Sequence, residues 1–238
     1  MKKYLAVIYR LFFSDIKSSV KFTMEAALER CFKRGIVLNT IIDVGASDGR
    51  WSKSCMDSYP SAQYLLIEAQ KQHAGNLQKF KSKHSNIDYV IAAAGKEEGE
   101  IFFNDSDPLG GQASDKPFDE STSTVRVPLT SIDIEVKKKN LKGPFLIKLD
   151  THGYEVPILE GAVETLKNTN LLIIETYNYK LTKDSLRYWE MNEYLSKLGF
   201  LSIEMVDPML RKHDLSFWQM DTFYVPSNSK ELEYNSFL

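Results

Sequence analysis

The chain has 238 residues, of which 43% are hydrophobic, so it can form one domain with a substantial core and a short appendage. Its formal net charge is −2 and its sequence contains no extended basic stripe, which argues against a nucleic-acid partner. Cys31 and Cys55 lack the spacing of a metal or redox motif, and two free thiols fit a reducing compartment such as the cytoplasm.

The N-terminal segment is apolar and basic. In residues 1–17, Arg10 interrupts the apolar run and no small-x-small cleavage pattern follows, so a secretory signal is not expected. The run is also shorter than the roughly 20 residues that cross a bilayer. We favour packing on the domain, and the alternative is a weak membrane-surface contact at the inner face of the membrane. A helix is predicted over residues 20–34, and we assign residues 1–40 to an N-terminal helical extension.

Residues 41–50, Ile-Ile-Asp-Val-Gly-Ala-Ser-Asp-Gly-Arg, indicate a buried strand, a glycine-bearing turn and a helix. Glycine lets the backbone come close to a ligand, because no Cβ blocks the approach. The dinucleotide fingerprint needs three glycines, and this turn has only two. Its acids suit a ligand with positive charge and hydroxyls, such as S-adenosylmethionine, and here the chain resembles class I methyltransferases. The predicted cofactor-binding residues of this turn are Asp43, Gly45, Ser47, Asp48 and Gly49.

Two further strands are predicted to complete the cofactor site. The strand at residues 64–67 ends in Glu68, and an acid at the end of the second strand meets ribose hydroxyls in Rossmann-like folds. The strand at residues 87–92 ends in small residues, and Ala92 and Ala93 leave room beside a flat ring. We therefore predict a ribose contact by Glu68 and an adenine contact by the two alanines.

A long polar segment separates the next two predicted strands, residues 99–104 and 125–129. Residues 105–123 are rich in Ser, Asp, Gly and Pro, which predicts a mobile loop. Loops of more than about 12–15 residues in a compact domain are usually functional or disordered. We therefore expect this loop to cover a substrate.

A second chemical centre follows the apolar strand at residues 145–149. Asp150 lies at its carboxyl end, where open α/β sheets bind their ligands, and His152 follows on the turn. The apolar strand at residues 171–174 ends in Glu175. Because parallel strands end on the same edge of a sheet, we expect Asp150, His152 and Glu175 to converge there.

The remaining predicted elements place the end of the chain in the same sheet. They are a helix over residues 154–167, a helix over residues 181–199, an antiparallel pair at 200–206 and 219–225, and a loop at 207–214 near the acceptor. Asp221 in the last strand is a buried acid for which a structural and a functional role are equally open. We assign residues 41–226 to the main domain and residues 227–238 to a polar C-terminal tail.

Residues 41–226 resemble the FkbM family of S-adenosylmethionine-dependent methyltransferases. The matching pieces are the Ile-Asp-Val-Gly-Ala turn, Glu68, Val-Pro-Leu-Thr-Ser-Ile-Asp ending at Asp133, Ile147–Asp150 with Gly153 and Glu155, and the final strand Trp218–Val225. Each piece alone is weak, and together they are fairly specific. Ser47 stands where the family often has Asn, and Thr151-His152 replaces the commoner Val-Glu pair, so an acid role does not carry over to position 152.

The resemblance implies an α/β fold with a Rossmann-like class I methyltransferase sheet, mostly parallel with an antiparallel last strand and helices on both faces. It also implies methyl transfer from S-adenosylmethionine to a hydroxyl of a carbohydrate, glycan or natural-product acceptor. An alcohol becomes a good nucleophile only when its proton is taken, so a base is expected. His152 is our first candidate because histidine titrates near neutral pH. Asp150 is predicted to orient His152, act as the base itself or help hold the cofactor, and Glu175 completes the predicted catalytic set.

A divalent metal ion is the rival explanation for Asp150, His152 and Glu175, because oxygen and nitrogen donors bind such ions and the ion would polarise the acceptor hydroxyl. No ligand spacing in the sequence demands a metal, so we expect S-adenosylmethionine alone as cofactor. The sequence predicts no oligomeric state.

Two other functions remain as alternatives. An NAD(P)-dependent oxidoreductase or epimerase uses a similar sheet, and the missing glycine triplet counts against it. A non-catalytic module that binds S-adenosylmethionine would keep the fold without the base. A nucleic-acid methylase is not expected, because no Pro-Pro-aromatic motif follows the acid of the fourth strand.

Overall fold

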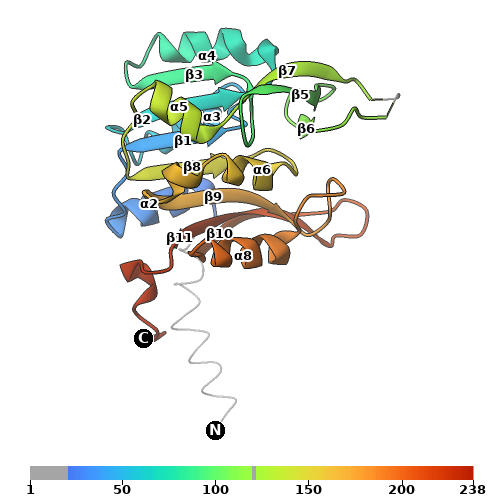
Figure 1. Cartoon of the computed structure of the whole chain (residues 1–238). Coiled ribbons are helices and arrows are strands. Elements are labelled where there is room, and N and C mark those ends of the chain that lie inside the picture. The colour runs from blue at the N-terminus through green and yellow to red at the C-terminus, as the bar shows by residue number, and fades with distance from the viewer. Residues whose placement is uncertain (1–20, 120–121, 238) are drawn as a thin grey trace.

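The computed structural model describes residues 21–119 and 122–237, so the prediction for residues 1–17 lies outside the described part. Within these ranges a seven-stranded sheet has the order β10-β11-β9-β8-β1-β2-β3 (Figure 1). Its strands are β1 (Thr40–Val44), β2 (Gln63–Glu68), β3 (Ile87–Ile91), β8 (Phe145–Leu149), β9 (Thr169–Tyr177), β10 (Phe200–Leu210) and β11 (Phe217–Pro226). Only β11 runs antiparallel to its neighbours, which confirms the predicted sheet.

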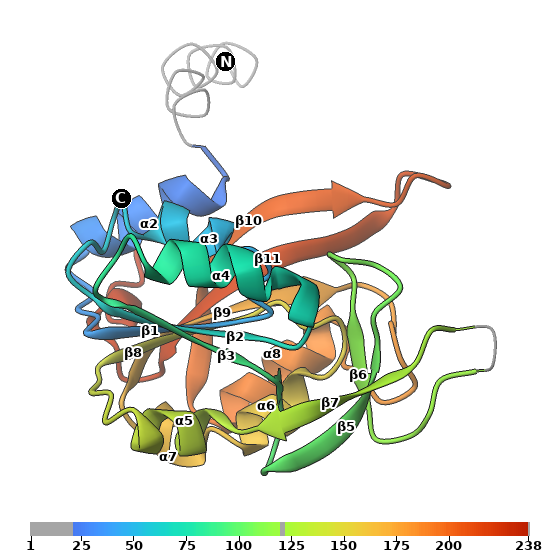
Figure 2. The ribbon, with the colours of Figure 1, turned by 90° about the horizontal axis from the view of Figure 1, so that it is seen from above.

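Helices cover both faces of this sheet (Figure 2). One face carries α2 (Met24–Lys33), α3 (Arg50–Cys55) and α4 (Ala74–Lys81), and the other carries α5 (Ile132–Lys138), α6 (Glu155–Glu160), α7 (Val163–Leu166) and α8 (Tyr188–Lys197). Two short 3₁₀ turns are η1 (Lys71–His73) and η2 (Lys230–Leu232). Successive residues of a strand point to opposite faces, so Ile41 packs in one apolar layer and Ile42 in the other. None of the described helices has the length and apolar character needed to span a membrane.

The predicted helix over residues 154–167 is wrong in one respect, because it is two helices. The helix α6 ends at Glu160, and α7 begins three residues later, at Val163. The Asp133 carboxylate accepts the backbone N–H groups of Glu164 at 2.9 Å and Thr165 at 2.8 Å. A side chain from another element thus supplies the partners that start the second helix, which helical periodicity alone does not reveal.

A second, four-stranded sheet was not predicted. Its order is β4-β7-β5-β6, with β4 (Ala93–Ala94), β5 (Gly99–Asn104), β6 (Gln112–Ser114) and β7 (Val125–Thr130). The strand β6 lies inside the segment 105–123, which was expected to be a mobile loop throughout. The Gln70 side chain also donates to the backbone carbonyls of Asp107 at 3.1 Å and Pro108 at 3.3 Å. Part of the predicted loop is therefore built into the fold.

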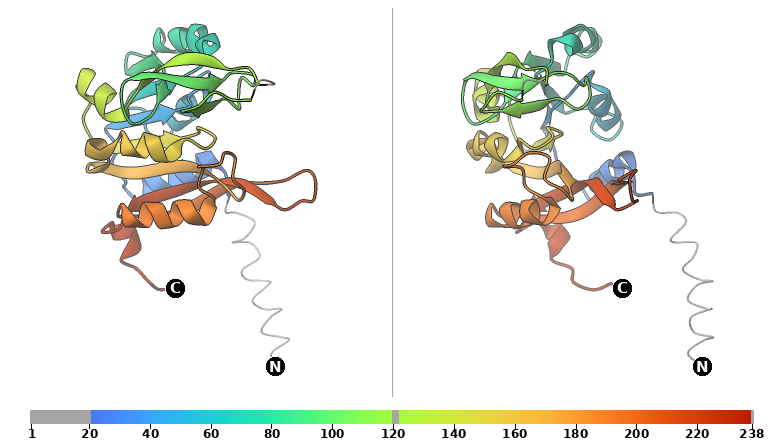
Figure 3. Two further views of the ribbon diagram at one scale, coloured as in Figure 1. Left: turned by 45° about the vertical axis from the view of Figure 1, so that its right-hand side comes forward. Right: turned by 90° about the vertical axis from the view of Figure 1, so that its right-hand side faces the viewer.

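The strands β10 and β11 form a hairpin that projects beyond the rest of the large sheet (Figure 3). The loop predicted at residues 207–214 is shorter than expected, because β10 continues to Leu210. At the start of α2, the Asp207 carboxylate accepts the backbone N–H of Met24 at 2.9 Å. Farther along α2, the Arg30 guanidinium donates two hydrogen bonds of 2.9 Å to Glu204. The helix α2 is therefore tied to this hairpin at both points.

We expect Glu204→Gln to lower the free energy of unfolding by about 1.5–3 kcal/mol at neutral pH, the range for hydrogen bonds to a charged group. Burial opposes ionisation of Glu204, but the bonds from Arg30 and Arg34 outweigh it and hold its pKa below the usual value. The contribution of ionised Glu204 to the free energy of unfolding is therefore present above the ordinary carboxyl pKa. It is lost as the pH falls through the lowered pKa of Glu204. Urea unfolding at several pH values measures it.

The matched control is Glu29→Gln, because Glu29 pairs with Lys33 at the exposed surface of α2. Its stability should match that of the wild type within error. Equal stability of the Glu204 and Glu29 variants at neutral pH would contradict the prediction.

Candidate functional site

A cavity of about 760 Å³ opens at the carboxyl ends of the parallel strands. This volume suits a small-molecule ligand. Residues from the ends of β1, β2, β8 and β9 line it, together with β11 and the small sheet. The predicted residues that line it are Gly45, Ser47, Glu68, Ala92, Ala93, Asp150, His152, Glu175 and Asp221.

The turn after β1 forms one side of the cavity. Gly45 has a φ of 78°, and a Cβ at this position would lie 2.0 Å from the backbone oxygen of Asp150. The glycine is therefore required by the approach of the segment after β8, as well as by its positive φ. The sequence predicted that a ligand comes close to the backbone at Gly45. In the fold, the atom that lies closest there is the backbone oxygen of Asp150, which belongs to the second chemical centre.

Glu68 joins this turn to the end of β2. One of its carboxylate oxygens accepts the backbone N–H of Ser47 at 2.7 Å, and the other accepts that of Gln70, also at 2.7 Å. Glu68 is buried, and burial raises its pKa despite these bonds. Each carboxylate oxygen has a second lone pair, so Glu68 can still accept hydrogen bonds from a ligand.

Two buried polar atoms of the cavity residues have no hydrogen-bond partner within the described part of the chain. They are the Ser47 hydroxyl and the Trp51 indole nitrogen. Buried polar groups without partners are rare in native proteins, and each calls for an explanation such as a ligand or water. The unpaired atoms lie on the same side of the cavity as the predicted cofactor residues.

Three residues predicted to bind the cofactor do not line the cavity. Asp43 is fully buried and accepts a hydrogen bond of 2.7 Å from the Ser52 hydroxyl of α3. Asp48 pairs with the guanidinium of Arg50. Gly49 packs against Phe80, where a Cβ would lie 2.7 Å from a ring carbon. Their predicted contacts with the cofactor stay predictions, and they do not come from the cavity lining.

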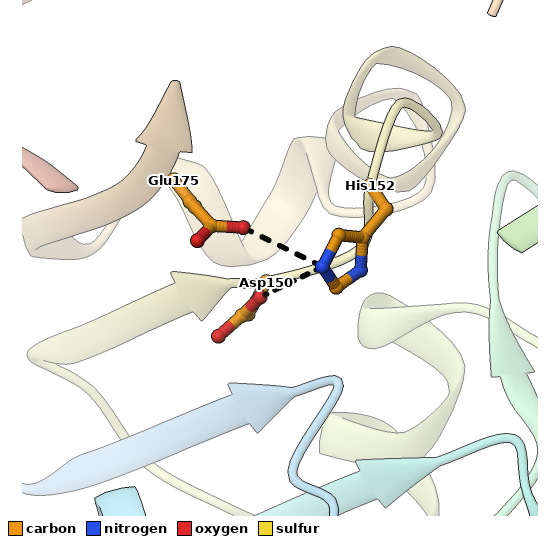
Figure 4. A group of neighbouring side chains, drawn as sticks. All are labelled: Asp150, His152 and Glu175. Atoms are coloured by element: carbon orange, nitrogen blue, oxygen red, sulfur yellow. Dashed lines mark ion pairs between the residues drawn. The ribbon is translucent and has the colours of Figure 1, made fainter. Parts of the chain in front are cut away.

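The second chemical centre brings Asp150, His152 and Glu175 together (Figure 4). Nε2 of His152 lies 3.8 Å from Oδ1 of Asp150 and 3.7 Å from Oε2 of Glu175. The three side chains are 35%, 22% and 12% exposed, so they are partly shielded from water and open to the cavity. The expected convergence at the carboxyl edge is present, and the roles of the three residues remain predictions.

Neighbouring side chains hold both carboxylates in place. Lys148, which is almost completely buried, donates a hydrogen bond of 2.7 Å to Oδ2 of Asp150 and lies over the Trp51 ring. The Tyr177 hydroxyl and the Gln219 side chain each donate a short hydrogen bond to Glu175. Lys148 thus holds the oxygen of Asp150 that faces away from His152, whereas Tyr177 holds the Glu175 oxygen that faces it.

The pKa values of the two carboxyls differ strongly. Burial raises the pKa of Glu175 to about 9, and the negative charge of Asp150 adds to the shift. Burial also opposes ionisation of Asp150, but the charge and hydrogen bond of Lys148 outweigh it and keep the pKa of Asp150 below its usual value. Burial raises the pKa of Asp221 to about 6. At neutral pH, Asp150 therefore carries the negative charge and Glu175 holds a proton.

Several residues of the cavity were missed in the sequence. Gln70 follows β2 and Phe103 lies in β5. Leu109 and Met209 lie in the segments 105–123 and 207–214, which were predicted to lie near the substrate without these residues being singled out. Lys148 also lines the cavity, and it is paired with Asp150. Only the pairing of distant strands brings these side chains together, and no local motif contains them.

The sequence matches the family model described as "Methyltransferase FkbM domain" over residues 43–202. This match includes both the turn after β1 and the centre at Asp150, His152 and Glu175. A comparison with curated proteins gave no match.

The comparison with solved structures gave the following similarities. Methyltransferase FkbM from Methylobacillus flagellatus KT is similar with a TM-score of 0.51 and 17% identity, over 80% of this chain and 46% of that one. The chain thus spans about half the length of this relative. A 1,6-didemethyltoxoflavin-N1-methyltransferase from Burkholderia thailandensis, solved with S-adenosylhomocysteine, has a TM-score of 0.46 and 10% identity over 95% of this chain and 90% of its own. Such low identities concern the fold alone.

Proposed function

The chain belongs to the FkbM methyltransferase domain family, and from this premise we propose that it transfers a methyl group from S-adenosylmethionine to a hydroxyl of a carbohydrate or natural-product acceptor. One observation carries the proposal. A single cavity joins Glu68 and the turn after β1 to the cluster of Asp150, His152 and Glu175. A cofactor site and a site for proton removal thus share one space.

The residues at the first end of the cavity fit the proposed cofactor. Glu68 is placed to accept hydrogen bonds from ribose hydroxyls, because each of its oxygens keeps a free lone pair. Ala92 and Ala93 leave room for a flat base beside β3. The Ser47 hydroxyl and the Trp51 N–H, buried and unpaired within the described residues, would reach a ligand in the cavity only after a shift of their side chains. When bound, S-adenosylmethionine supplies a methyl group already activated by a sulfonium.

The residues at the second end serve the acceptor. His152 is the candidate base, since its Nε2 faces the cavity between two carboxyls. Asp150, kept ionised by Lys148, would orient the imidazole and stabilise its protonated form. Alignment of the acceptor hydroxyl and removal of its proton are the two tasks left to the protein.

A neutral or cationic polyhydroxyl compound is the acceptor that the lining favours. The carboxylates of Glu25, Asp207 and Asp221 line the cavity, whereas its cations Lys148 and Arg50 are already paired with Asp150 and Asp48. An acceptor with a negative charge would meet repulsion there. We also propose the cytoplasm as the compartment, which the two buried free thiols support.

Calorimetric titration with S-adenosylmethionine, S-adenosylhomocysteine and NAD tests the cofactor assignment. We expect the first two to bind one per chain and NAD not to bind. NAD binding would favour the oxidoreductase alternative, and no binding at all would overturn the proposal. Release of S-adenosylhomocysteine with a panel of sugars then separates an enzyme from a module that only binds the cofactor.

A further inference from the structure

Three donor atoms face one another beside the cavity. Nε2 of His152, one oxygen of Asp150 and one oxygen of Glu175 all lie within 4.8 Å of one another. Figure 4 shows the imidazole edge pointing between the two carboxyl groups. The distances of 3.8 Å and 3.7 Å from Nε2 are too long for hydrogen bonds. The nitrogen therefore faces both oxygens without bonding to either.

Neighbouring side chains bind the two carboxyl donors, as outer residues do in metal sites. Lys148 holds the oxygen of Asp150 that faces away from His152, and Tyr177 and Gln219 hold Glu175. Such outer partners fix the direction of first-layer ligands in metal sites. The two carboxyl donors are therefore held by residues other than His152.

An independent observation comes from the last strand of the sheet. Asp221 lies opposite Glu175 in the strand pairing and lines the same cavity. Within the described ranges, no hydrogen bond or ion pair is made by its carboxylate. Asp150, Glu175 and Asp221 thus surround the cavity near a single buried cation, Lys148, which is already paired with Asp150. A bound cation would take the place of the Glu175 proton and offset the negative charge of these carboxyl groups.

We propose that Asp150, His152 and Glu175 bind one divalent first-row transition-metal ion, such as Mn²⁺. One imidazole nitrogen and two carboxylate oxygens form a mixed donor set, whereas Mg²⁺ and Ca²⁺ are typically bound by oxygen alone. Three protein ligands leave coordination positions open toward the cavity. The sequence did not demand a metal, because the ligands come from two strands whose spacing carries no motif.

The catalytic consequence rests on the proposed function, whereas ion binding does not. The Nε2 lone pair of His152 serves either the ion or a proton, so in the loaded enzyme His152 is a ligand and not the base. The ion would then polarise the acceptor hydroxyl. Asp221, which lines the same cavity, would take the proton as the O–H bond breaks, and the acceptor oxygen would take the methyl group from the sulfonium.

The test uses the full chain, stripped with a chelator and titrated with Mn²⁺ while free Mn²⁺ is followed by electron paramagnetic resonance. We expect one ion per chain, with at least about tenfold weaker binding in His152→Ala and in Glu175→Gln. His84→Ala is the matched control, because His84 packs against Phe80 and is not a cavity residue. It should bind Mn²⁺ as the wild type does.

Absence of Mn²⁺ binding to the wild type at millimolar concentration would overturn the site, and so would unchanged affinity in both ligand variants. Circular dichroism and S-adenosylmethionine affinity show whether the variants are folded. If one variant does not fold, the affinity of the other variant and the number of ions bound by the wild type still test the ion site. Full turnover in chelator would overturn the catalytic role of the ion, whereas failure to bind S-adenosylmethionine would overturn the proposed function and leave the ion site standing.

Discussion

Replacing His152 with alanine is expected to lower kcat by about 10²–10⁴-fold, the usual contribution of general acid–base catalysis. The imidazole faces the cavity between Asp150 and Glu175, whether it takes the proton of the acceptor or holds an ion that polarises it. Either role acts on the acceptor hydroxyl. Affinity for S-adenosylmethionine should stay within about twofold, because Glu68 and the turn after β1 are unchanged.

The measurement is the rate of S-adenosylhomocysteine release with an acceptor found in the sugar panel, alongside calorimetry for the cofactor. His84→Ala again serves as the control and should keep the wild-type kcat. A normal kcat in the His152 variant would remove this residue from the catalytic set. Loss of cofactor affinity together with activity would indicate a structural role instead.

Replacing Glu68 with glutamine is expected to weaken S-adenosylmethionine binding by roughly 10–100-fold, which corresponds to about 1.5–3 kcal/mol for hydrogen bonds to a charged group. The backbone N–H groups of Ser47 and Gln70 each point at one carboxylate oxygen. A glutamine amide has only one oxygen, so its NH₂ must face one of these donors. The variant therefore loses the ligand contact and also loosens the turn that surrounds the ligand.

Calorimetric titration measures this loss, and thermal unfolding reports whether the variant is folded. Glu97→Gln is the matched control, because Glu97 is exposed in the turn before β5. Its cofactor affinity should equal that of the wild type. Equal affinities in the Glu68 and Glu97 variants would refute the ribose assignment of Glu68.

The cofactor end of the cavity was partly predictable from local patterns. Glu68 and Gly45 line the cavity as expected, because a strand that ends in an acid or a glycine places that residue at the carboxyl edge. Asp43, Asp48 and Gly49 of the same turn do not line the cavity. Their side chains or Cα atoms face Ser52, Arg50 and Phe80, and the sequence gives no sign of which way a turn residue points.

The acceptor end depended more on tertiary structure. Asp150 and Glu175 follow neighbouring parallel strands, so their approach could be expected from strand order. The positions of Gln219 and Asp221 could not, because they follow from the antiparallel pairing of β11 with β9. The small sheet was missed for the same reason, since β4 and β7 pair across a long stretch of sequence.

The sequence by itself determined the family, the mostly parallel sheet and the two segments that carry the chemistry, because strand periodicity, turn glycines and strand-end acids are local signals. Only the tertiary structure decided which side chains share the cavity. It set the distances from His152 to Asp150 and Glu175, and it paired Lys148 with Asp150. Those facts depend on register and packing between segments far apart in the chain, where no local pattern records which residues meet.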